Sequence, residues 1–162
     1  MHSIRPRLIA AAVAALLLTA PTTAHADITA FLGAYLTPTR QPVQGVSVGF
    51  KILVAGVEFE FVRATEDLET HRPETQAGSA SVLVETPTGR VKLYGLLGAG
   101  LYRERIAGVS GDTSTSLHAG GGVKIALTGP IGLRVDYRLV NMNGRVEDKR
   151  QQRLYAGVPV DF

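Results

Sequence analysis

The chain has 162 residues, a formal net charge of +3 and no cysteine. This length suits a single domain, and the missing cysteines exclude both disulfides and a lipid-anchored N-terminal cysteine. No basic stripe interleaved with aromatic residues is present, so nucleic acid is a poor partner. The 18 glycines are poor helix formers and favour β structure.

The first 26 residues have the three parts of an export signal. Arg5 and Arg7 precede an apolar stretch over residues 8–20, and Ala24-His25-Ala26 provides a small-residue cleavage site at Ala24 and Ala26. The apolar stretch is shorter than the roughly 20 residues that a membrane-spanning helix needs. We therefore expect residues 1–26 to be a cleaved signal peptide and residues 27–162 to form the mature domain.

Eight segments of the mature chain alternate apolar and polar residues with a period of two, which is typical of strands with two unlike faces. The expected strands cover residues 28–36, 46–54, 57–64, 79–86, 91–102, 115–127, 131–139 and 153–162. In the first of them, apolar residues occupy one face while Phe31 and Tyr35 occupy the other. The register of this strand therefore stays open.

The connections between these segments alternate in length. Long connections are expected at residues 37–45, 65–78, 103–114 and 140–152, and short ones at 55–56, 87–90 and 128–130. Bacterial outer-membrane barrels have this layout, with long extracellular loops and short periplasmic turns. The sequence thus predicts an all-β fold, an eight-stranded antiparallel up-and-down transmembrane β-barrel.

The polar faces of these strands carry charges of both signs. Because eight strands enclose just enough space for side chains, we expect these charges to pair inside the barrel, where an unpaired ion costs several kcal/mol. The expected interior network comprises Lys51, Glu58, Glu60, Glu85, Lys92, Lys124, Arg134, Asp136 and Arg138. The apolar faces have one clear exception, Arg63, which we expect near the outer rim. The alternative is a soluble periplasmic barrel that binds an apolar ligand inside.

The last strand, Leu154 to Phe162, resembles the C-terminal signal of bacterial outer-membrane barrels, an alternating strand that ends in Phe. The glycine-rich segment from Leu93 to Tyr102 resembles a strand of small OmpA- and OmpX-like barrels. The resemblance implies an outer-membrane monomer of a Gram-negative-type bacterium, in contact with lipid and lipopolysaccharide. It also implies that the barrel-assembly machinery reads Leu154, Ala156, Val158, Val160 and Phe162. Pro159 departs from this pattern because proline lacks a ladder donor, and a bulge at the seam with the first strand would accommodate it.

Some eight-stranded barrels modify lipid A, so catalysis has to be considered. Ser116 and His118 share one face of a strand, and a serine, a histidine and a carboxylate together can form a hydrolase site. Both are expected to face the lumen, which a lipid reaches with difficulty, and their order differs from the His-then-Ser motif of lipid A deacylases. We therefore expect a non-enzymatic protein without cofactor, metal or catalytic residues, and with a structural, adhesive or protective role at the cell surface. A lipid A-modifying enzyme is the alternative.

Two long connections carry clusters of charge. Arg145, Lys149, Arg150 and Arg153 lie in or beside the last one and are candidates for contact with lipopolysaccharide phosphates. The second could hold a divalent cation but matches no calcium-loop spacing, so a solvated loop is favoured; its residues are Glu66, Asp67, Glu69, His71 and Glu74. The glycines at 98, 100 and 120–122 precede no helix, so they are expected to relieve crowding and let tyrosines lie across the strands.

Overall fold

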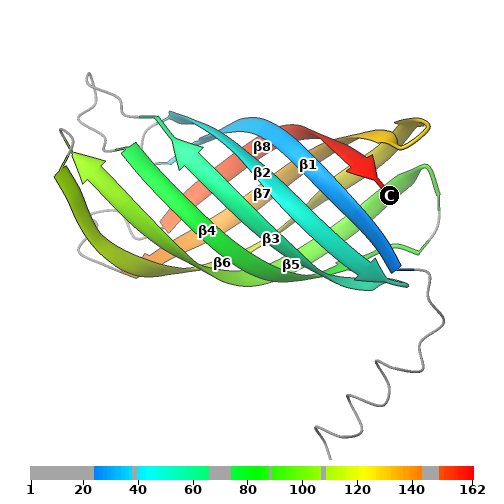
Figure 1. Cartoon of the computed structure of the whole chain (residues 1–162), viewed down its shortest axis with the longest axis horizontal. Helices are drawn as coiled ribbons and strands as arrows, with labels where there is room; N and C mark the ends of the chain where they lie inside the picture. The colour runs from blue at the N-terminus through cyan, green and yellow to red at the C-terminus, as the bar shows by residue number, and fades with distance from the viewer. Residues whose placement is uncertain (1–23, 38–39, 66–73, 88, 107–108, 144–149) are drawn as a thin grey trace, which may run out of the picture.

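The computed structural model describes residues 24–37, 40–65, 74–87, 89–106, 109–143 and 150–162. They form eight strands, β1 (Ala24–Tyr35), β2 (Gln41–Ile52), β3 (Ala55–Ala64), β4 (Glu74–Glu85), β5 (Val91–Ile106), β6 (Val109–Thr128), β7 (Ile131–Asn143) and β8 (Arg150–Asp161). Each strand pairs antiparallel with its neighbours in the chain, and β8 pairs with β1 to close the barrel (Figure 1). The predicted fold class is confirmed. Within the described ranges, no helix is long and apolar enough to cross a membrane.

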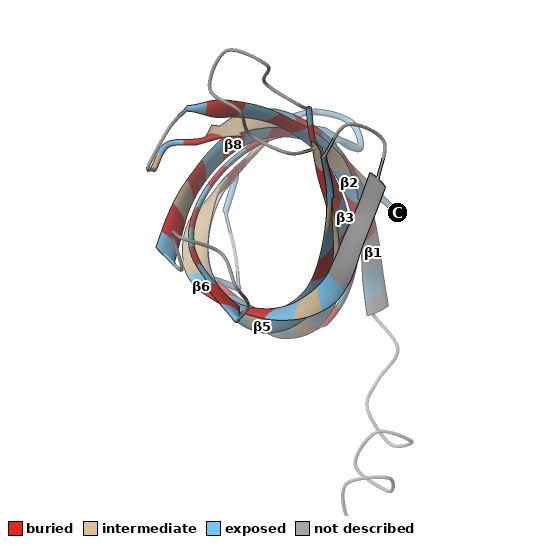
Figure 2. Ribbon diagram, turned by 90° about the vertical axis from the view of Figure 1, so that its left-hand side faces the viewer, coloured by how far each residue is buried: buried red, intermediate tan, exposed pale blue. Residues whose placement is uncertain are grey.

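The barrel has two different ends. The C-terminus and the start of β1 lie at one end, together with the turns that join β2 to β3, β4 to β5 and β6 to β7 (Figure 1). We call this the inner end and the opposite one the outer end. The strands run steeply tilted between the two ends (Figure 1). Figure 2 is turned by 90° from Figure 1, and in this view the strands form a closed ring on which buried and exposed residues alternate.

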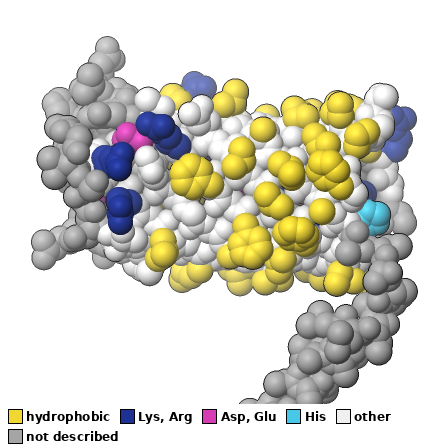
Figure 3. All heavy atoms as spheres, viewed as in Figure 1, with side chains coloured by type: hydrophobic (Ala, Val, Ile, Leu, Met, Phe, Trp, Pro, Cys, Tyr) yellow, Lys and Arg dark blue, Asp and Glu magenta, His cyan; other side chains and the backbone are white. Residues whose placement is uncertain are grey.

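The two faces of the wall are chemically opposite. Apolar side chains such as Leu97 point outward and are highly exposed, whereas Arg134 and Asp136 are fully buried inside. Hydrophobic side chains accordingly cover the middle of the outer surface, and Lys and Arg side chains appear towards its ends (Figure 3). A soluble barrel would hide its apolar face instead, so the soluble alternative is wrong. The exposed belt is the surface that lipid requires.

Two connections differ from the expectation. The chain turns at Leu53 and Val54, where Leu53 has a φ of 58°, and residues 55–56 already belong to β3. Residues 103–114, expected as a long loop, are mostly strand, because β5 continues to Ile106 and β6 starts at Val109. Arg103 pairs with Thr113 and donates to its hydroxyl, so polar cross-strand contacts extend this hairpin.

The pairing of β1 with β8 determines the register of β1 and the backbone around Pro159. Phe31 and Tyr35 of β1 both point inward and are buried, which fixes the register of this strand. Pairing from Asp27–Asp161 to Tyr35–Arg153 runs without a register shift, so the expected bulge at this seam is wrong. On its other side, β8 loses pairing with β7 around Pro159 and resumes it in the same register. The missing donor of the proline therefore falls in this gap.

Candidate functional site

The middle of the lumen is built around two arginines on one face of β7. Arg134 donates from Nε to the Tyr94 hydroxyl at 2.7 Å and from Nη2 to Asp136 Oδ2 at 3.0 Å. Its other terminal nitrogen forms an ion pair with Glu58. Arg134, Asp136 and Glu58 are all fully buried. The Tyr94 hydroxyl in turn donates to Asp136, which links β5 to β7 across the barrel.

Arg138 is the next inward residue after Asp136 along β7 and shares the same anions. Its Nε donates to Asp136 Oδ1 at 2.8 Å, and its Nη2 donates to Glu58 Oε1 at 2.8 Å. The same Nη2 lies 2.9 Å from the Tyr155 hydroxyl, and Nη1 lies 3.1 Å from Glu60 Oε2. Glu58 and Asp136 thus each serve both arginines, so the central group acts as one network.

Arg153 extends this network towards β8. Its Nη2 donates to Glu60 Oε1 at 2.6 Å, and its guanidinium lies 5.4 Å from the centre of the Tyr155 ring. The Tyr155 ring stacks on Phe31 with their centroids 4.1 Å apart. The expectation that Arg153 contacts lipopolysaccharide is therefore wrong, since its side chain is buried inside. In the sequence, Arg153 alternates with the apolar Leu154, and this alternation already indicated that Arg153 faces inward.

A second charged group closes the inner end of the lumen. Lys124 lies 2.8 Å from Asp27 and 3.4 Å from Glu85. Lys51 donates to Glu85 at 2.8 Å, and Lys92 lies 3.5 Å from the same carboxylate. Sequence reasoning missed Asp27, because it stands at the expected start of the mature chain and before the expected first strand.

The structure places all nine residues of the expected network on the inward face. With Asp27 and Arg153 added, five carboxylates face six cations in the described part of the lumen; these are Asp27, Glu58, Glu60, Glu85 and Asp136, and Lys51, Lys92, Lys124, Arg134, Arg138 and Arg153. Beside Lys51 and Lys124 a cavity of about 20 Å³ remains, which is room for about one water. A wider space of about 400 Å³ opens at the inner mouth of the lumen beside His25 and Glu85.

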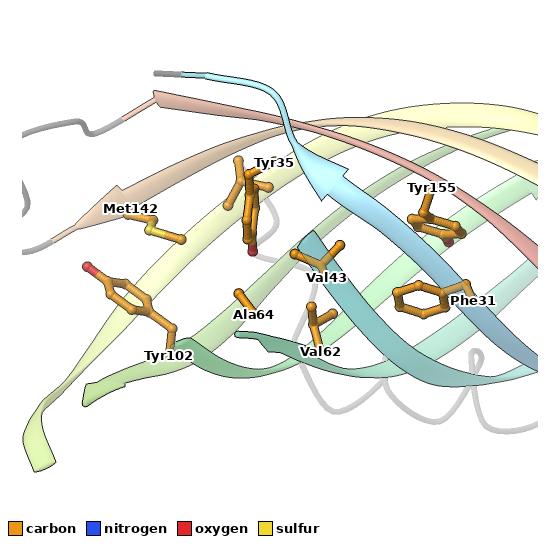
Figure 4. Close-up of a cluster of buried hydrophobic side chains, with 9 residues drawn as sticks. Phe31, Tyr35, Val43, Val62, Ala64, Tyr102, Met142 and Tyr155 are labelled. Carbon is orange, nitrogen blue, oxygen red and sulfur yellow. The ribbon is translucent and has the colours of Figure 1, made fainter. Parts of the chain in front are cut away.

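The outer part of the lumen also holds a cluster of apolar and aromatic side chains. The labelled side chains of this cluster converge inside the barrel from several strands (Figure 4). Its buried members are Phe31, Tyr35, Val43, Val62, Ala64, Tyr102, Val140, Met142 and Tyr155. Phe31 and Tyr155 contact the charged network, and members such as Val62 and Met142 lie nearer the outer end.

The serine–histidine pair differs from the expected one. Ser116 and His118 both face the lumen and are buried, as expected, but His118 Nε2 lies 2.7 Å from Ser81 Oγ. A Cβ added to Gly98 would approach both groups to 2.5 Å, so this glycine makes room for the pair. Among the described residues, no hydrogen bond joins His118 to a carboxylate. The pair therefore lacks the third member of a hydrolase triad.

Glycines do make room for tyrosines across the strands. A Cβ at Gly122 would lie 2.6 Å from the Tyr94 hydroxyl, the group that bridges Arg134 and Asp136. The bare backbone at Gly122 is therefore needed for Tyr94 to reach the network.

The charged residues of the outer end have mixed outcomes. Arg63 lies one residue from the outer end of β3, as expected near the rim, and its Nε lies 2.8 Å from Glu74. Arg150 is exposed at the start of β8. Among the described residues, no group of three His, Asp or Glu could hold a metal ion. The other expected cation and phosphate contacts lie outside the described residues; they are Glu66, Asp67, Glu69, His71, Arg145 and Lys149.

The sequence matches the model of the outer membrane protein beta-barrel domain over residues 10–162. The chain belongs to this family. It is therefore an outer-membrane protein, and the expected localisation is confirmed. A search of curated protein sequences found no significant match.

Solved outer-membrane barrels share this fold. Neisserial surface protein A (NspA) matches with a TM-score of 0.68 and 23% identity, over 86% of this chain and 96% of that one. The N-terminal barrel domain of Pseudomonas aeruginosa OprF matches with a TM-score of 0.62 and 19% identity, over 85% and 97%. Ail, the attachment invasion locus protein of Yersinia pestis, was solved with the heparin analogue sucrose octasulfate. It matches with a TM-score of 0.54 and 17% identity, over 86% and 98%.

An enzyme also has this fold. The outer membrane enzyme PagL matches with a TM-score of 0.53 and 12% identity, over 83% of this chain and 98% of that one. At these identities the likeness is one of fold. Function has to be argued from the residues of this chain.

Proposed function

We propose that this outer-membrane barrel is non-enzymatic and has a structural, adhesive or protective role at the cell surface. The observation that supports it is the lumen itself, which is filled by mutually paired charges and by an apolar cluster. Such an interior offers no wide pore, and its larger opening beside His25 and Glu85 lies at the inner end, away from the cell surface. The activity of the protein then rests on its outer end and its lipid-facing wall.

The outer end favours adhesion to acidic molecules. Exposed arginines stand there at the ends of several strands; those in the described residues are Arg40, Arg63, Arg103, Arg105 and Arg150. A guanidinium matches the geometry of phosphate and sulfate groups and binds them through charge-assisted hydrogen bonds. Ail, which has the same fold, was crystallised with a sulfated glycan analogue, which supports the same ligand class for this chain.

Retention on immobilised heparin tests the adhesive role. We expect the refolded barrel in detergent to be retained at low salt and released as ionic strength rises. The double variant Arg103→Gln/Arg150→Gln should elute at lower salt than the unmodified protein. Arg90→Gln, which changes an exposed arginine at the inner end, is the matched control. Failure of the unmodified barrel to bind, or an equal loss in the control, would reject adhesion through the outer end.

Lipid A modification is the second candidate, favoured by the Ser81–His118 contact and by the fold shared with PagL. Mass spectra of lipid A from cells with and without the protein test it. We expect identical spectra, because the serine–histidine pair is buried in the lumen. A lost acyl chain that returns in the Ser81→Ala variant would establish the enzyme instead.

Biogenesis follows the expected signals in this proposal. Cleavage after Ala26 releases a monomer that starts at Asp27, and the barrel-assembly machinery reads the outward residues of β8. The exposed Leu154, Val158 and Phe162 side chains support that role. N-terminal sequencing should find Asp27 first, and Phe162→Ala should lower the amount of heat-modifiable barrel in the outer membrane. An unchanged amount of barrel would remove Phe162 from the signal.

A further inference from the structure

The lipid-facing wall is not smooth, because a groove of about 650 Å³ crosses it at the β1–β8 seam. Ala30 and Ala156 both point outward there, and their small side chains leave a depression in the lipid-facing surface. Leu32 and Val158 stand beside them as larger neighbours. The volume lies within the roughly 300–1,000 Å³ typical of small-molecule sites.

The groove runs obliquely along the barrel. It begins at Leu133, near the inner end of β7, and ends at Arg63, near the outer end of β3. Between them it crosses β8, β1 and β2, so it spans four inter-strand spacings of about 4.8 Å, or about 19 Å. With strands tilted by about 45°, this length descends about 13 Å through a membrane band of about 25 Å. The groove therefore has the depth of one lipid leaflet.

The chemistry of the groove changes only at its outer end. Most of its length is apolar, but Gln44 and Arg63, which face each other across β2 and β3, provide polar groups at the rim. About half of the Arg63 side chain is exposed, and its contact with Glu74 is made through Nε. A guanidinium carries four further N–H donors on its two terminal nitrogens, and these suit a phosphate group.

We propose that this groove binds one acyl chain of a phosphorylated lipid of the outer leaflet, with the lipid phosphate at Arg63. An apolar groove facing lipid is filled by hydrocarbon, and the positive charge stands where the head group of an outer-leaflet lipid would lie. The site adds a specific lipid partner to the proposed surface role. It rests on the membrane orientation of the wall and not on the binding of glycans by the outer end.

Native mass spectrometry of the refolded barrel with added lipid A tests the site. We expect one bound lipid A per barrel, and weaker binding of the same lipid A after removal of its phosphates. Ala30→Phe should abolish the bound lipid, because the new ring fills the groove. Arg63→Gln should weaken binding by about tenfold and remove the preference for the phosphorylated lipid.

Two further variants make the result decisive. Ala156→Phe fills the groove from β8 and should match Ala30→Phe, so a folding defect in either one leaves the other informative. Ala119→Phe adds the same ring to the outward face of β6, away from the groove, and should bind lipid A as the unmodified barrel does. A heat-dependent gel shift verifies that each variant is folded.

Equal lipid binding in the unmodified barrel and in both filled variants would overturn the proposal. So would a barrel that binds dephosphorylated and phosphorylated lipid A equally. A dimer that forms without lipid and dissociates in Ala30→Phe would assign the groove to a second copy of the chain and overturn it as well. Heparin retention is measured without lipid, so failure of the adhesive role and failure of this site are distinguishable.

Discussion

The middle and the outer part of the lumen are equally buried, but they are filled by different chemistry. In the middle, Arg134 and Arg138 share the carboxylates of Glu58 and Asp136. Towards the outer end, apolar side chains such as Val62 and Met142 converge inside the barrel (Figure 4). The inward face of a strand is therefore not polar along its whole length. An inward position means burial, and the inward side chains of the middle are ion pairs, whereas many of those further out are apolar.

In the comparison of the middle with the outer part of the lumen, we expect the largest loss in the free energy of unfolding from Arg134→Met. This change leaves Glu58 and Asp136 with one arginine to share, and breaking a buried ion network costs about 3–5 kcal/mol. Thermal loss of the β-barrel circular dichroism signal in detergent measures it. Arg150→Met, an exposed arginine at the outer end, should change the free energy of unfolding by less than about 0.5 kcal/mol. Equal effects of both variants would mean that the central network adds no stability.

A smaller loss is expected from the apolar part. Met142→Ala removes a buried side chain from the outer cluster, and we expect a cost of about 2 kcal/mol, at the low end for such truncations. The loss should stay below that of Arg134→Met, because this truncation leaves no buried charge without a partner. The same thermal measurement compares the variant with Met142→Leu, which keeps the volume and should be nearly neutral. A loss larger than that of Arg134→Met would reverse the comparison.

The smallest expected effect lies outside both parts and is a gain. Leu53 adopts a left-handed backbone conformation, with φ of 58°, in the turn between β2 and β3. Because glycine adopts this conformation without a Cβ clash, Leu53→Gly should raise the free energy of unfolding by about 1 kcal/mol. Val54→Gly is the matched control and should give no gain. If Leu53→Gly lowers the stability, the side chain and not the backbone determines this turn.

The period-two pattern was sufficient to predict the number of strands and the inward charges, because a charge facing lipid costs several times more than any local preference. It could not place Phe31 and Tyr35, since these two aromatic residues oppose an equally apolar face that includes Leu32, and only the closed barrel shows that they point inward. Similarly, the Leu53 turn has no glycine at its left-handed position, so the nearby Gly56 indicated the wrong turn.

The strand extension over residues 103–114 was hidden for another reason. Most of its residues are charged, hydroxyl-bearing or glycine, and such a segment has no apolar period. The Ser81–His118 contact could not be predicted from the sequence either, because it joins β4 to β6 across β5. Contacts across the lumen depend on the shear of the closed barrel, which the pattern of one strand does not contain.

Conductance of the purified barrel in a planar lipid bilayer tests most directly whether paired charges and the apolar cluster fill the lumen. We predict a silent membrane for the unmodified protein, with folding verified by the heat-dependent gel shift. Regular current steps at neutral pH would contradict the account, because they would require a water-filled path past the Arg134–Glu58 pair and the outer cluster.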